Sequence, residues 1–501
     1  MEKFLNFDKN IKILNYIGGK FTEPLKKNYI DNYNPSRGVV YGQIPDSDAE
    51  DVNLAIQAAK NAFPNWSQLT AEARANYLRK FSENILKKLD QFVLAESTDS
   101  GKPVAVSRAV DIPRSAKNFE FFADAITQFH GESFRSNKTT INYTDYSALG
   151  AVACISPWNL PLYLLTWKIA PALAAGNTVV AKPSEFTPLT ASLLAQVADE
   201  IGLPPGVLNI IHGTGAVVGA PLVEHIDIKA VSFTGSTTTG RTIAKAVATQ
   251  FKKVSLEMGG KNPNIIFADC DFEKALETTL RSSFANQGQI CLCGSRIFVE
   301  KPIYEKFRNA LVEKINQLKQ GDPMLLETQQ GAVVSKQHMQ KVLSYIQLAK
   351  TEGGTILTGG KAAEMSGPLK QGYYIEPTLI EGLSHLCRTN QEEIFGPVAT
   401  IMPFTTEAEV LEMANSTKYG LACSVWTSNL NRAQKFAVRI ESGIVWINTW
   451  MFRDLRTPFG GVKESGFGRE GGMEALKFFS EVKNICIQSD DSSNQNSQEI
   501  L

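Results

Sequence analysis

The stretch Leu149–Lys182, LGAVACISPWNLPLYLLTWKIAPALAAGNTVVAK, decides the expected fold class of this chain. Its two ends are short apolar runs that are typical of buried strands, and Leu160–Ala175 between them is long enough for a helix. A strand, a helix and a second strand in this order form a βαβ unit with parallel strands. The sequence therefore predicts a parallel sheet that is covered by helices.

The same alternation continues to the C-terminal side of this stretch. Further strands are expected at residues 208–212 and 230–233, and helices at residues 187–201, 216–225 and 240–250. A second series places strands at residues 264–267, 295–300, 397–403, 422–427 and 443–448, and helices at residues 272–286, 303–318, 337–352, 407–415 and 431–440. We therefore predict an α/β fold with two domains, each a Rossmann-like, doubly wound parallel sheet, and a boundary near Glu257.

The remaining segments are expected to be accessory to these sheets. Residues 9–45 indicate loops and short strands, and residues 46–125 indicate helices that are broken near Gly101–Pro103 and at Pro113. Ser136–Tyr146 alternates like a hairpin, and it is the natural partner for a late strand at Lys483–Gln488, a pairing that could run across subunits. The polar residues 489–501 are expected to be a disordered tail.

Composition excludes several classes of function. The 501 residues include 51 basic and 51 acidic ones, and this zero net charge indicates neither a nucleic-acid partner nor an anionic membrane. The N-terminal residues 1–10 lack the apolar core of a signal peptide. The uncharged stretch Tyr146–Trp167 contains prolines and is better explained by a strand, a turn and a helix start than by a membrane span.

The cysteine and histidine contents bear on compartment and metal binding. Seven scattered cysteines without a CxxC pair indicate reduced thiols and hence a cytoplasmic protein. We expect no metal site, because the five histidines are widely spaced and no HExxH motif occurs.

Two glycine-rich turns indicate a nucleotide site. Gly213–Gly219 (GTGAVVG) and Phe233–Gly240 (FTGSTTTG) each follow a predicted strand and open a predicted helix, whose free N–H groups can hold a phosphate. Lys182 and Glu185 end another strand, and a carboxylate there can bind a ribose hydroxyl. Each signal alone is also explained by an ordinary turn or a solvated charged pair, but together they favour nucleotide binding.

Two further stretches carry groups with catalytic chemistry. Asn286–Cys293 (NQGQICLC) leads polar and glycine residues into Cys291, a candidate nucleophile, although a lone cysteine is more often a buried apolar residue. Glu257 stands beside two glycines, where shelter from water would raise its pKa and suit a general base, although most acids at such turns are solvated.

Taken together, seven motifs resemble the NAD(P)-dependent aldehyde dehydrogenase superfamily in order and spacing over nearly the whole chain. They are Pro157-Trp-Asn159, Lys182-Pro-Ser-Glu185, Phe233-Thr-Gly235-Ser236, Glu257-Met-Gly-Gly-Lys261, Asn286-x-Gly-Gln-x-Cys291, Glu393-Ile-Phe395-Gly-Pro397 and Pro458-Phe-Gly-Gly461. The resemblance implies that Cys291 attacks the aldehyde, that Asn159 and the Cys291 N–H hold the oxyanion, and that Glu257 activates the water that hydrolyses the thioester.

The resemblance also implies NAD as the cofactor. The residues implied to line its adenosine and pyrophosphate half are Trp158, Lys182, Glu185, Gly215, Gly219, Phe233, Gly235 and Ser236, and those at the nicotinamide half are Glu393 and Phe395. Glu185 at the ribose favours NAD over NADP. One departure is Thr238-Thr239, which replaces an acidic and an aliphatic residue and should affect cofactor affinity only.

The resemblance further implies a division of the chain and an assembly. Residues 1–130 and 147–256 would form the NAD-binding domain, residues 257–470 the catalytic domain, and residues 131–146 and 471–488 a small β oligomerisation arm. We expect a homodimer or a homotetramer that acts on a small aldehyde.

The substrate is indicated by two arginines. Asp111-Ile-Pro-Arg114 and the stretch Trp450–Gly461 with Arg453 resemble the subgroup that oxidises 2-aminomuconate and 2-hydroxymuconate semialdehydes, in which the matching arginines bind the substrate carboxylate. The alternative is that both arginines form surface ion pairs, with Asp454 as a neighbour. Cys293 is expected only to line the pocket.

We therefore predict NAD-dependent oxidation of a carboxylate-bearing semialdehyde, 2-aminomuconate 6-semialdehyde before 2-hydroxymuconate semialdehyde, in tryptophan or aromatic ring-cleavage catabolism. The alternatives are a broad aliphatic, retinal or betaine aldehyde dehydrogenase, an enzyme that transfers its acyl group to coenzyme A, and an inactive structural or binding protein on the same fold.

Overall fold

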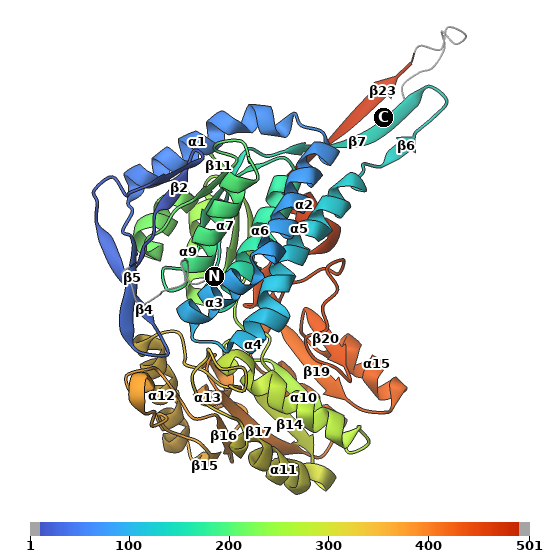
Figure 1. Ribbon diagram of the computed structural model, residues 1–501. Coiled ribbons are helices and arrows are strands. Elements are labelled where there is room, and N and C mark those ends of the chain that lie inside the picture. Colours follow the sequence, from blue (N-terminus) through green and yellow to red (C-terminus); the bar gives the residue numbers. More distant parts are fainter. Residues whose placement is uncertain (1–10, 490–501) are drawn as a thin grey trace.

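Two large sheets organise the computed structural model, which describes residues 11–489 (Figure 1). The first sheet has, within these residues, eight strands: β22 (Gly466–Phe467), β12 (Lys253–Glu257), β11 (Ile228–Thr234), β8 (Ala151–Ile155), β9 (Thr178–Lys182), β10 (Leu208–Ile210), β2 (Asn15–Ile17) and β3 (Lys20–Thr22), in spatial order. The run from β12 to β10 is parallel. The strand order reverses between β8 and β11, and ligands of such sheets bind beside the carboxyl ends of strands at this point.

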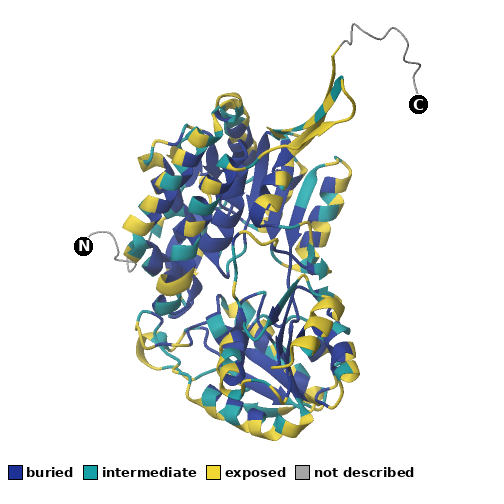
Figure 2. Ribbon diagram, turned by 90° about the vertical axis from the view of Figure 1, so that its right-hand side faces the viewer, coloured by how far each residue is buried: buried dark blue, intermediate teal, exposed yellow. Residues whose placement is uncertain are grey.

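Helices cover both faces of the first sheet because its strands are apolar on both sides. Val152 and Cys154 of β8 face a core formed with α2 (Ala71–Lys87), α5 (Ile112–Thr127), α6 (Pro161–Ala174) and α7 (Leu189–Glu200). Ala151 and Ala153 face the opposite core, with α1 (Ala49–Ser67), α8 (Ala220–Glu224) and α9 (Thr237–Ala248). Buried residues concentrate on the sheets and on the inward faces of the helices (Figure 2).

The second sheet has the same construction. Its seven strands within the described residues are β15 (Thr355–Thr358), β16 (Thr378–Glu381), β17 (Val398–Phe404), β14 (Arg296–Glu300), β13 (Pro263–Ile266), β19 (Ala422–Trp426) and β20 (Ile444–Ile447), parallel except for β15. One face packs on α10 (Phe272–Phe284) and α11 (Tyr304–Asn316), and the other packs on α14 (Glu407–Asn415) and α15 (Leu430–Arg439). The predicted doubly wound α/β class is therefore confirmed, with element ends shifted by a few residues.

The other elements are short or lie beside the sheets. They are β1 (Ile11–Lys12), β4 (Tyr29–Asn34), β5 (Val39–Pro45), α3 (Leu89–Ser100), α4 (Val104–Val106), η1 (Ser107–Asp111), η2 (Gly215–Gly219), η3 (Ala285–Gly288), η4 (Lys301–Ile303), α12 (Lys336–Thr351), η5 (Gly367–Leu369), α13 (Arg388–Gln391), β18 (Tyr419–Gly420) and β21 (Val462–Lys463). Along the chain, the last parallel strand of the first sheet, β12, ends at Glu257, and the first strand of the second sheet, β13, begins at Pro263. The division of the chain into domains stays a prediction.

The predicted break at Pro113 is wrong. The π-helix η1 leads directly into α5, and Pro113 lies in the first turn of α5. Proline is tolerated there because the first N–H groups of a helix have no intrahelical partner. The π-helix matters below, because it carries Asp111 and is followed by Arg114.

An arm of three strands projects from the body (Figure 1). It consists of β6 (Ser133–Arg135), β7 (Thr140–Ala148) and β23 (Ser480–Gln488), and β23 pairs with β7 of the same chain from Ser480 with Ala148 to Gln488 with Thr140. The hairpin is thus confirmed as the partner of the late strand, within one chain. Assignment of all of residues 471–488 to the arm is wrong, because α16 (Gly472–Phe478) packs its apolar side into the core of the first sheet.

Residues 1–10 and the predicted tail from residue 490 onward lie outside the described residues. In residues 11–489, no helix combines the length and the hydropathy that crossing a membrane requires.

Candidate active site

The turn that presents Cys291 is held in an unusual backbone conformation. Asn286 and Gln287 have φ values of 50° and 54°, and Gly288 continues in the left-handed region at 68°. A side chain at Gly288 would approach the Gly396 carbonyl oxygen to 2.0 Å. Left-handed residues other than glycine cost energy and persist only where the surroundings fix them, and they cluster at functional sites.

Two side chains fix the turn after Cys291 through its carbonyl groups. The Asn262 amide donates to the carbonyl oxygens of Cys291 at 2.7 Å and Cys293 at 2.9 Å. The Trp450 indole N–H donates to the Leu292 carbonyl at 2.8 Å. Cys291 itself is half-buried, whereas Cys293 is buried in the apolar cluster behind it.

Asn159 lies against the same turn. Its side-chain Nδ2 donates to the Gln289 backbone carbonyl at 2.9 Å, and the backbone carbonyl of Asn159 accepts from Asn286 Nδ2 at 3.0 Å. The structure therefore brings together Asn159 and the Cys291 turn, which are 132 positions apart in the chain.

Glu257 is buried, not solvated, with 3% of its surface exposed. Both of its carboxylate oxygens lack a hydrogen-bond partner within the described residues. Burial raises the pKa of Glu257 well above 4.5, and the nearby Glu470 raises it further. Glu470 in turn is ion-paired with Lys168. The Ser232 hydroxyl accepts a hydrogen bond from Lys168 and donates one to Glu470.

The Cys291 thiol is protonated in this environment. Burial raises the pKa of Cys291 to about 12, while the positive charge of Arg453 acts in the opposite direction. Formation of the thiolate must therefore be assisted by a base or by groups that bind with the reactants.

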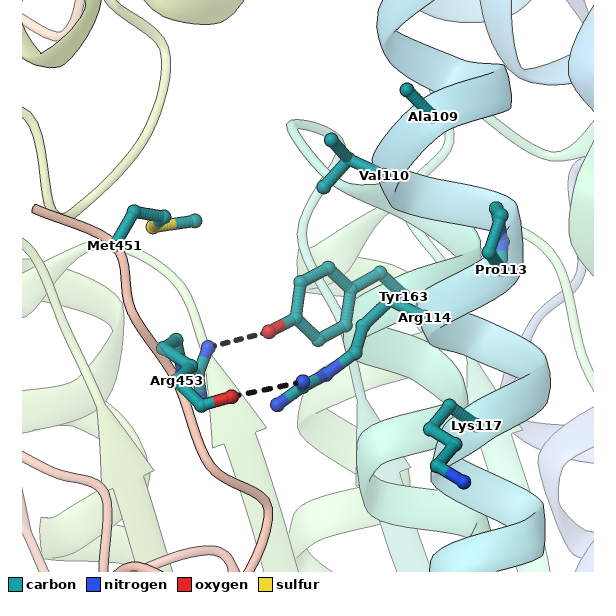
Figure 3. A pocket seen from close by; sticks show the side chains of 8 residues that line it. All are labelled: Ala109, Val110, Pro113, Arg114, Lys117, Tyr163, Met451 and Arg453. Atoms are coloured by element: carbon teal, nitrogen blue, oxygen red, sulfur yellow. Dashed lines mark hydrogen bonds between the residues drawn. The ribbon is translucent and has the colours of Figure 1, made fainter.

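A pocket of about 420 Å³ lies between α5, α6 and the loop after β20 (Figure 3). Arg114 enters it from α5, and Arg453 enters it from the loop after β20. Arg453 donates to the Tyr163 hydroxyl at 2.7 Å, and Arg114 donates to the Arg453 carbonyl at 3.2 Å. Met451 lines the pocket, and both Met451 and Cys291 pack against the same apolar cluster.

Neither pocket arginine has a carboxylate partner within salt-bridge distance in residues 11–489. Asp454, the expected neighbour, pairs instead with the exposed Arg456 at 2.6 Å. The Nε and Nη2 atoms of Arg114 are buried without an acceptor in the same part of the chain. Buried guanidinium donors without partners are costly, and a carboxylate bound in the pocket would satisfy them.

A second cavity, of about 540 Å³, lies at the carboxyl ends of the central strands of the first sheet. It is lined by all eight residues predicted for the adenosine and pyrophosphate half: Trp158, Lys182, Glu185, Gly215, Gly219, Phe233, Gly235 and Ser236. Lys182 and Glu185 form an ion pair of 3.3 Å at its edge. Thr238 and Thr239, the departure noted in the sequence, also line it.

The glycines of this cavity fit a bound nucleotide. Apart from the neighbouring chain itself, a Cβ at Gly215 would meet no atom of residues 11–489 within 4 Å, and one at Gly219 would meet only the Lys182 side chain at 3.9 Å. Neither residue has a left-handed φ, so the backbone itself does not require glycine at either position. The space that a Cβ would fill is available to a ligand that approaches the backbone, as phosphates do at such turns.

Glu393 and Phe395 lie apart from this cavity, close to the Cys291 turn. Glu393 accepts from the Gly260 N–H at 2.9 Å, and burial raises the pKa of its carboxyl. Phe395 has a left-handed φ of 63°, its carbonyl accepts from His338 at 2.7 Å, and its ring contacts Trp158 edge-on at 5.3 Å. Trp158 therefore links the two groups of predicted cofactor residues.

The family model for aldehyde dehydrogenases matches residues 21–485. This chain belongs to the aldehyde dehydrogenase family.

Individual members of the family agree with this assignment. A 2-aminomuconic semialdehyde dehydrogenase of Danio rerio is 49% identical over 483 residues, which cover 96% of this chain and 99% of the relative. A 2-hydroxymuconic semialdehyde dehydrogenase of Pseudomonas sp. (strain CF600) is 44% identical over 95% of this chain and 99% of its own length. The NAD⁺ complex of an aldehyde dehydrogenase from Bacillus cereus superposes with a TM-score of 0.95 at 37% identity, covering 98% of this chain and 99% of that one.

Sequence reasoning missed several residues of this aldehyde dehydrogenase site. They are Asn262 and Trp450 at the nucleophile turn, Lys168 and Glu470 beside Glu257, His338 beside Phe395, and a buried ion cluster behind Asn159. Lys168 had a signal, because it directly follows an uncharged stretch that is predicted to be buried.

Proposed function

We propose that this protein oxidises a carboxylate-bearing semialdehyde to the diacid with NAD, with 2-aminomuconate 6-semialdehyde as the leading substrate and 2-hydroxymuconate semialdehyde next. The observation that carries the proposal is the pair of arginines in one pocket, neither with a carboxylate partner within residues 11–489, of which Arg453 is near enough to act electrostatically on the Cys291 thiol. The names of the relatives from Danio rerio and Pseudomonas support the same substrate class.

The reaction begins at Cys291: once a base has taken the thiol proton, the thiolate attacks the aldehyde carbon to give a thiohemiacetal. Asn159 has one Nδ2 hydrogen on the Gln289 carbonyl, and its second hydrogen is free to stabilise the oxyanion together with the Cys291 N–H. The carboxylate at the far end of the substrate binds Arg114 and Arg453, which places the aldehyde at the thiol.

NAD, when bound, supplies the acceptor for the hydride of the thiohemiacetal. The residues that line the cavity beside β8 and β11 hold its adenosine and pyrophosphate, and Glu393 and Phe395 hold the nicotinamide half. Glu185 lines this cavity, where its carboxylate would bind the ribose hydroxyls and its negative charge would disfavour the extra phosphate of NADP.

Glu257 completes the reaction by taking a proton from the water that attacks the Cys291 thioester. The C–S bond breaks, the acid leaves, and the departing Cys291 sulfur takes up the proton held by Glu257, which restores the thiol. The buried Glu257 carboxyl has a raised pKa and no hydrogen-bond partner within residues 11–489, which suits a base that takes up a proton in each cycle.

The arginine assignment predicts a loss of substrate discrimination. We expect Arg114→Met or Arg453→Met to lower kcat/KM for 2-hydroxymuconate semialdehyde by about 10- to 100-fold, because a charge-assisted hydrogen bond contributes about 1.5–3 kcal/mol. Turnover of a neutral aldehyde should fall less than about threefold in Arg114→Met, since its tail needs no cation. Steady-state kinetics with both aldehydes measures this.

Lys117→Met is the matched control for these variants. Lys117 lines the same pocket but is exposed and paired with Glu120 at 2.9 Å. The Lys117→Met variant should leave kcat/KM unchanged for both the acidic and the neutral aldehyde. Equal losses for the acidic and the neutral aldehyde in Arg114→Met would contradict the carboxylate role.

We also propose that the protein is a cytoplasmic homodimer or homotetramer. The arm exposes apolar side chains, including Phe134, Val482 and Ile487, and an exposed strand edge of this kind favours pairing with a second copy. Light scattering should give two or four times the chain mass of 55.0 kDa, and a single chain mass would contradict the assembly. All seven cysteines are free thiols, as in a reducing compartment, and recovery of the protein outside the cell would contradict that location.

A further inference from the structure

Behind Asn159 lies an ion cluster that the reaction described above does not use. The Lys102 ammonium group contacts Glu96 at 3.2 Å and Asp111 at 2.5 Å, and all three side chains have 0% exposure. Burying such a cluster in place of apolar residues rarely adds stability, because each charge loses its hydration. The cluster therefore needs an explanation other than stability alone.

The third contact of the Lys102 ammonium group is with the loop between β8 and α6, which carries Asn159. It donates to the backbone carbonyl of Asn159 at 3.0 Å, and Asn286 Nδ2 donates to the same carbonyl at 3.0 Å. Glu96 accepts from the Leu162 N–H at 3.5 Å, three residues further along. The loop between β8 and α6 has no regular structure of its own, so these contacts fix its position.

The position of Lys102 is itself fixed by the second half of the molecule. Gly101 ends α3 with a left-handed φ of 73°, and its carbonyl accepts from the Ala332 N–H at 3.1 Å. The Val104 N–H donates to the Pro323 carbonyl at 2.8 Å. The Gly101–Val104 segment is thus anchored on both sides of Lys102.

Asp111 extends the cluster towards the substrate pocket. It is the last residue of the π-helix η1, and Arg114 follows in the first turn of α5. Short π-helical segments occur frequently at functional sites, where they change the direction of the following side chains. One ammonium group therefore holds both the loop with Asn159 and the segment that carries Arg114.

We propose that Lys102 is a positioning residue for aldehyde oxidation: its ammonium group, held by Glu96 and Asp111, fixes the backbone of Asn159 and thereby aims the Asn159 amide at the oxyanion. This inference rests on the proposed role of Asn159. An oxyanion donor must lie within about 2.7–3.1 Å of the developing charge, and a misplacement of about 1 Å costs roughly 10²-fold in rate.

The test is a double-mutant cycle between the cluster and Asn159. Lys102→Met alone would leave two buried carboxyls without their cation, so the main variant is the triple replacement Glu96→Gln/Lys102→Met/Asp111→Asn, which removes all three charges at similar volume. The triple variant and Lys102→Met are each combined with Asn159→Ala. The rate of the first NADH turnover is measured by stopped flow, with KM for NAD and thermal unfolding measured beside it.

We expect the triple variant to slow the first turnover by about 10- to 100-fold, with KM for NAD within about twofold of the parent. In the Asn159→Ala background the same replacement should cost less than about twofold, because the amide that it positions is already absent. A folded Lys102→Met variant should show the same two losses as the triple variant.

Two results would overturn the inference while leaving the proposed function intact. One is an unchanged first turnover in the triple variant, and the other is a set of losses that multiply, which would indicate a general structural role. If Asn159→Ala alone turned over as fast as the parent, the oxyanion assignment would fail and the role of Lys102 would fail with it.

Discussion

Replacing Cys291 by alanine is expected to abolish NADH formation, with a loss in kcat on the order of 10⁴-fold or more, because no other group can form the covalent intermediate. Cys291 is the half-buried thiol at the end of a strained turn, and Asn262 and Trp450 fix the carbonyls around it. Stopped-flow absorbance at saturating NAD and semialdehyde measures the effect. Alkylation of Cys291, followed by mass spectrometry, should abolish activity in parallel.

Cys270→Ser is the matched control for this prediction. Cys270 is also half-buried, but it lies at the turn before α10 and lines neither the pocket of Arg114 and Arg453 nor the cavity beside Glu393 and Phe395. Its replacement should leave kcat within about twofold of the parent, as is usual for substitutions away from special features. Residual NADH formation in Cys291→Ala above about 1% of the parent rate would refute the nucleophile assignment.

Replacing Glu257 by glutamine is expected to separate the two halves of the reaction. The first turnover should still form one NADH per site, and steady turnover should then fall by about 10²- to 10⁴-fold, because the thioester has lost its general base. The burst measured by stopped flow and an acyl adduct on Cys291 in the mass spectrum should appear together. The exposed Glu474→Gln, which removes an equivalent carboxylate paired with Lys477, should show neither effect.

The pH dependence of the parent enzyme follows from the same carboxyl. Burial raises the pKa of Glu257 well above 4.5, so the group is mostly protonated below that raised pKa and can act as a base only after it loses the proton. Steady turnover should therefore increase as the pH rises towards the raised pKa.

Unimpaired steady turnover in Glu257→Gln, or product formation only after addition of coenzyme A, would contradict the hydrolytic role.

The fold could be predicted from the sequence because both sheets are built from local signals. Apolar runs such as Val152–Ile155 predict strands buried on both faces, and their regular alternation with helices leaves few topologies. The missed features depend on context. Pro113 is read as a break unless the π-helix before it is known, and α16 is too short to be distinguished from the strand that follows it.

The candidate site was predictable where one motif carries both the reactive group and its local setting, as at Cys291 and Gly215. It was not predictable where the function of a residue depends on a contact across the fold. Lys102 reaches Asn159 over 57 positions, and Lys168 reaches Glu470 over 302. Nothing in a single sequence distinguishes Glu96 from the many acids on solvated helix faces, because its burial is produced by the packing of other segments.

The pocket arginines and the arrangement of the catalytic residues argue against two of the alternative functions. A broad aliphatic aldehyde dehydrogenase would gain nothing from two guanidinium groups in its pocket, since a neutral substrate tail cannot satisfy the buried donors of Arg114. An inactive protein on the same fold has no physical reason to retain together a strained nucleophile turn, a hydrogen-bonded Asn159 and a buried Glu257 that has no hydrogen-bond partner in residues 11–489.

The most direct test of the central claim is a comparison of kcat/KM for 2-hydroxymuconate semialdehyde and for hexanal, an unbranched neutral aldehyde of similar length, with NAD and the unmodified enzyme. We expect the acidic substrate to be favoured by at least about 10²-fold, because two guanidinium groups bind its carboxylate and each charge-assisted hydrogen bond contributes about 1.5–3 kcal/mol. Equal kcat/KM values for the two aldehydes would contradict the account.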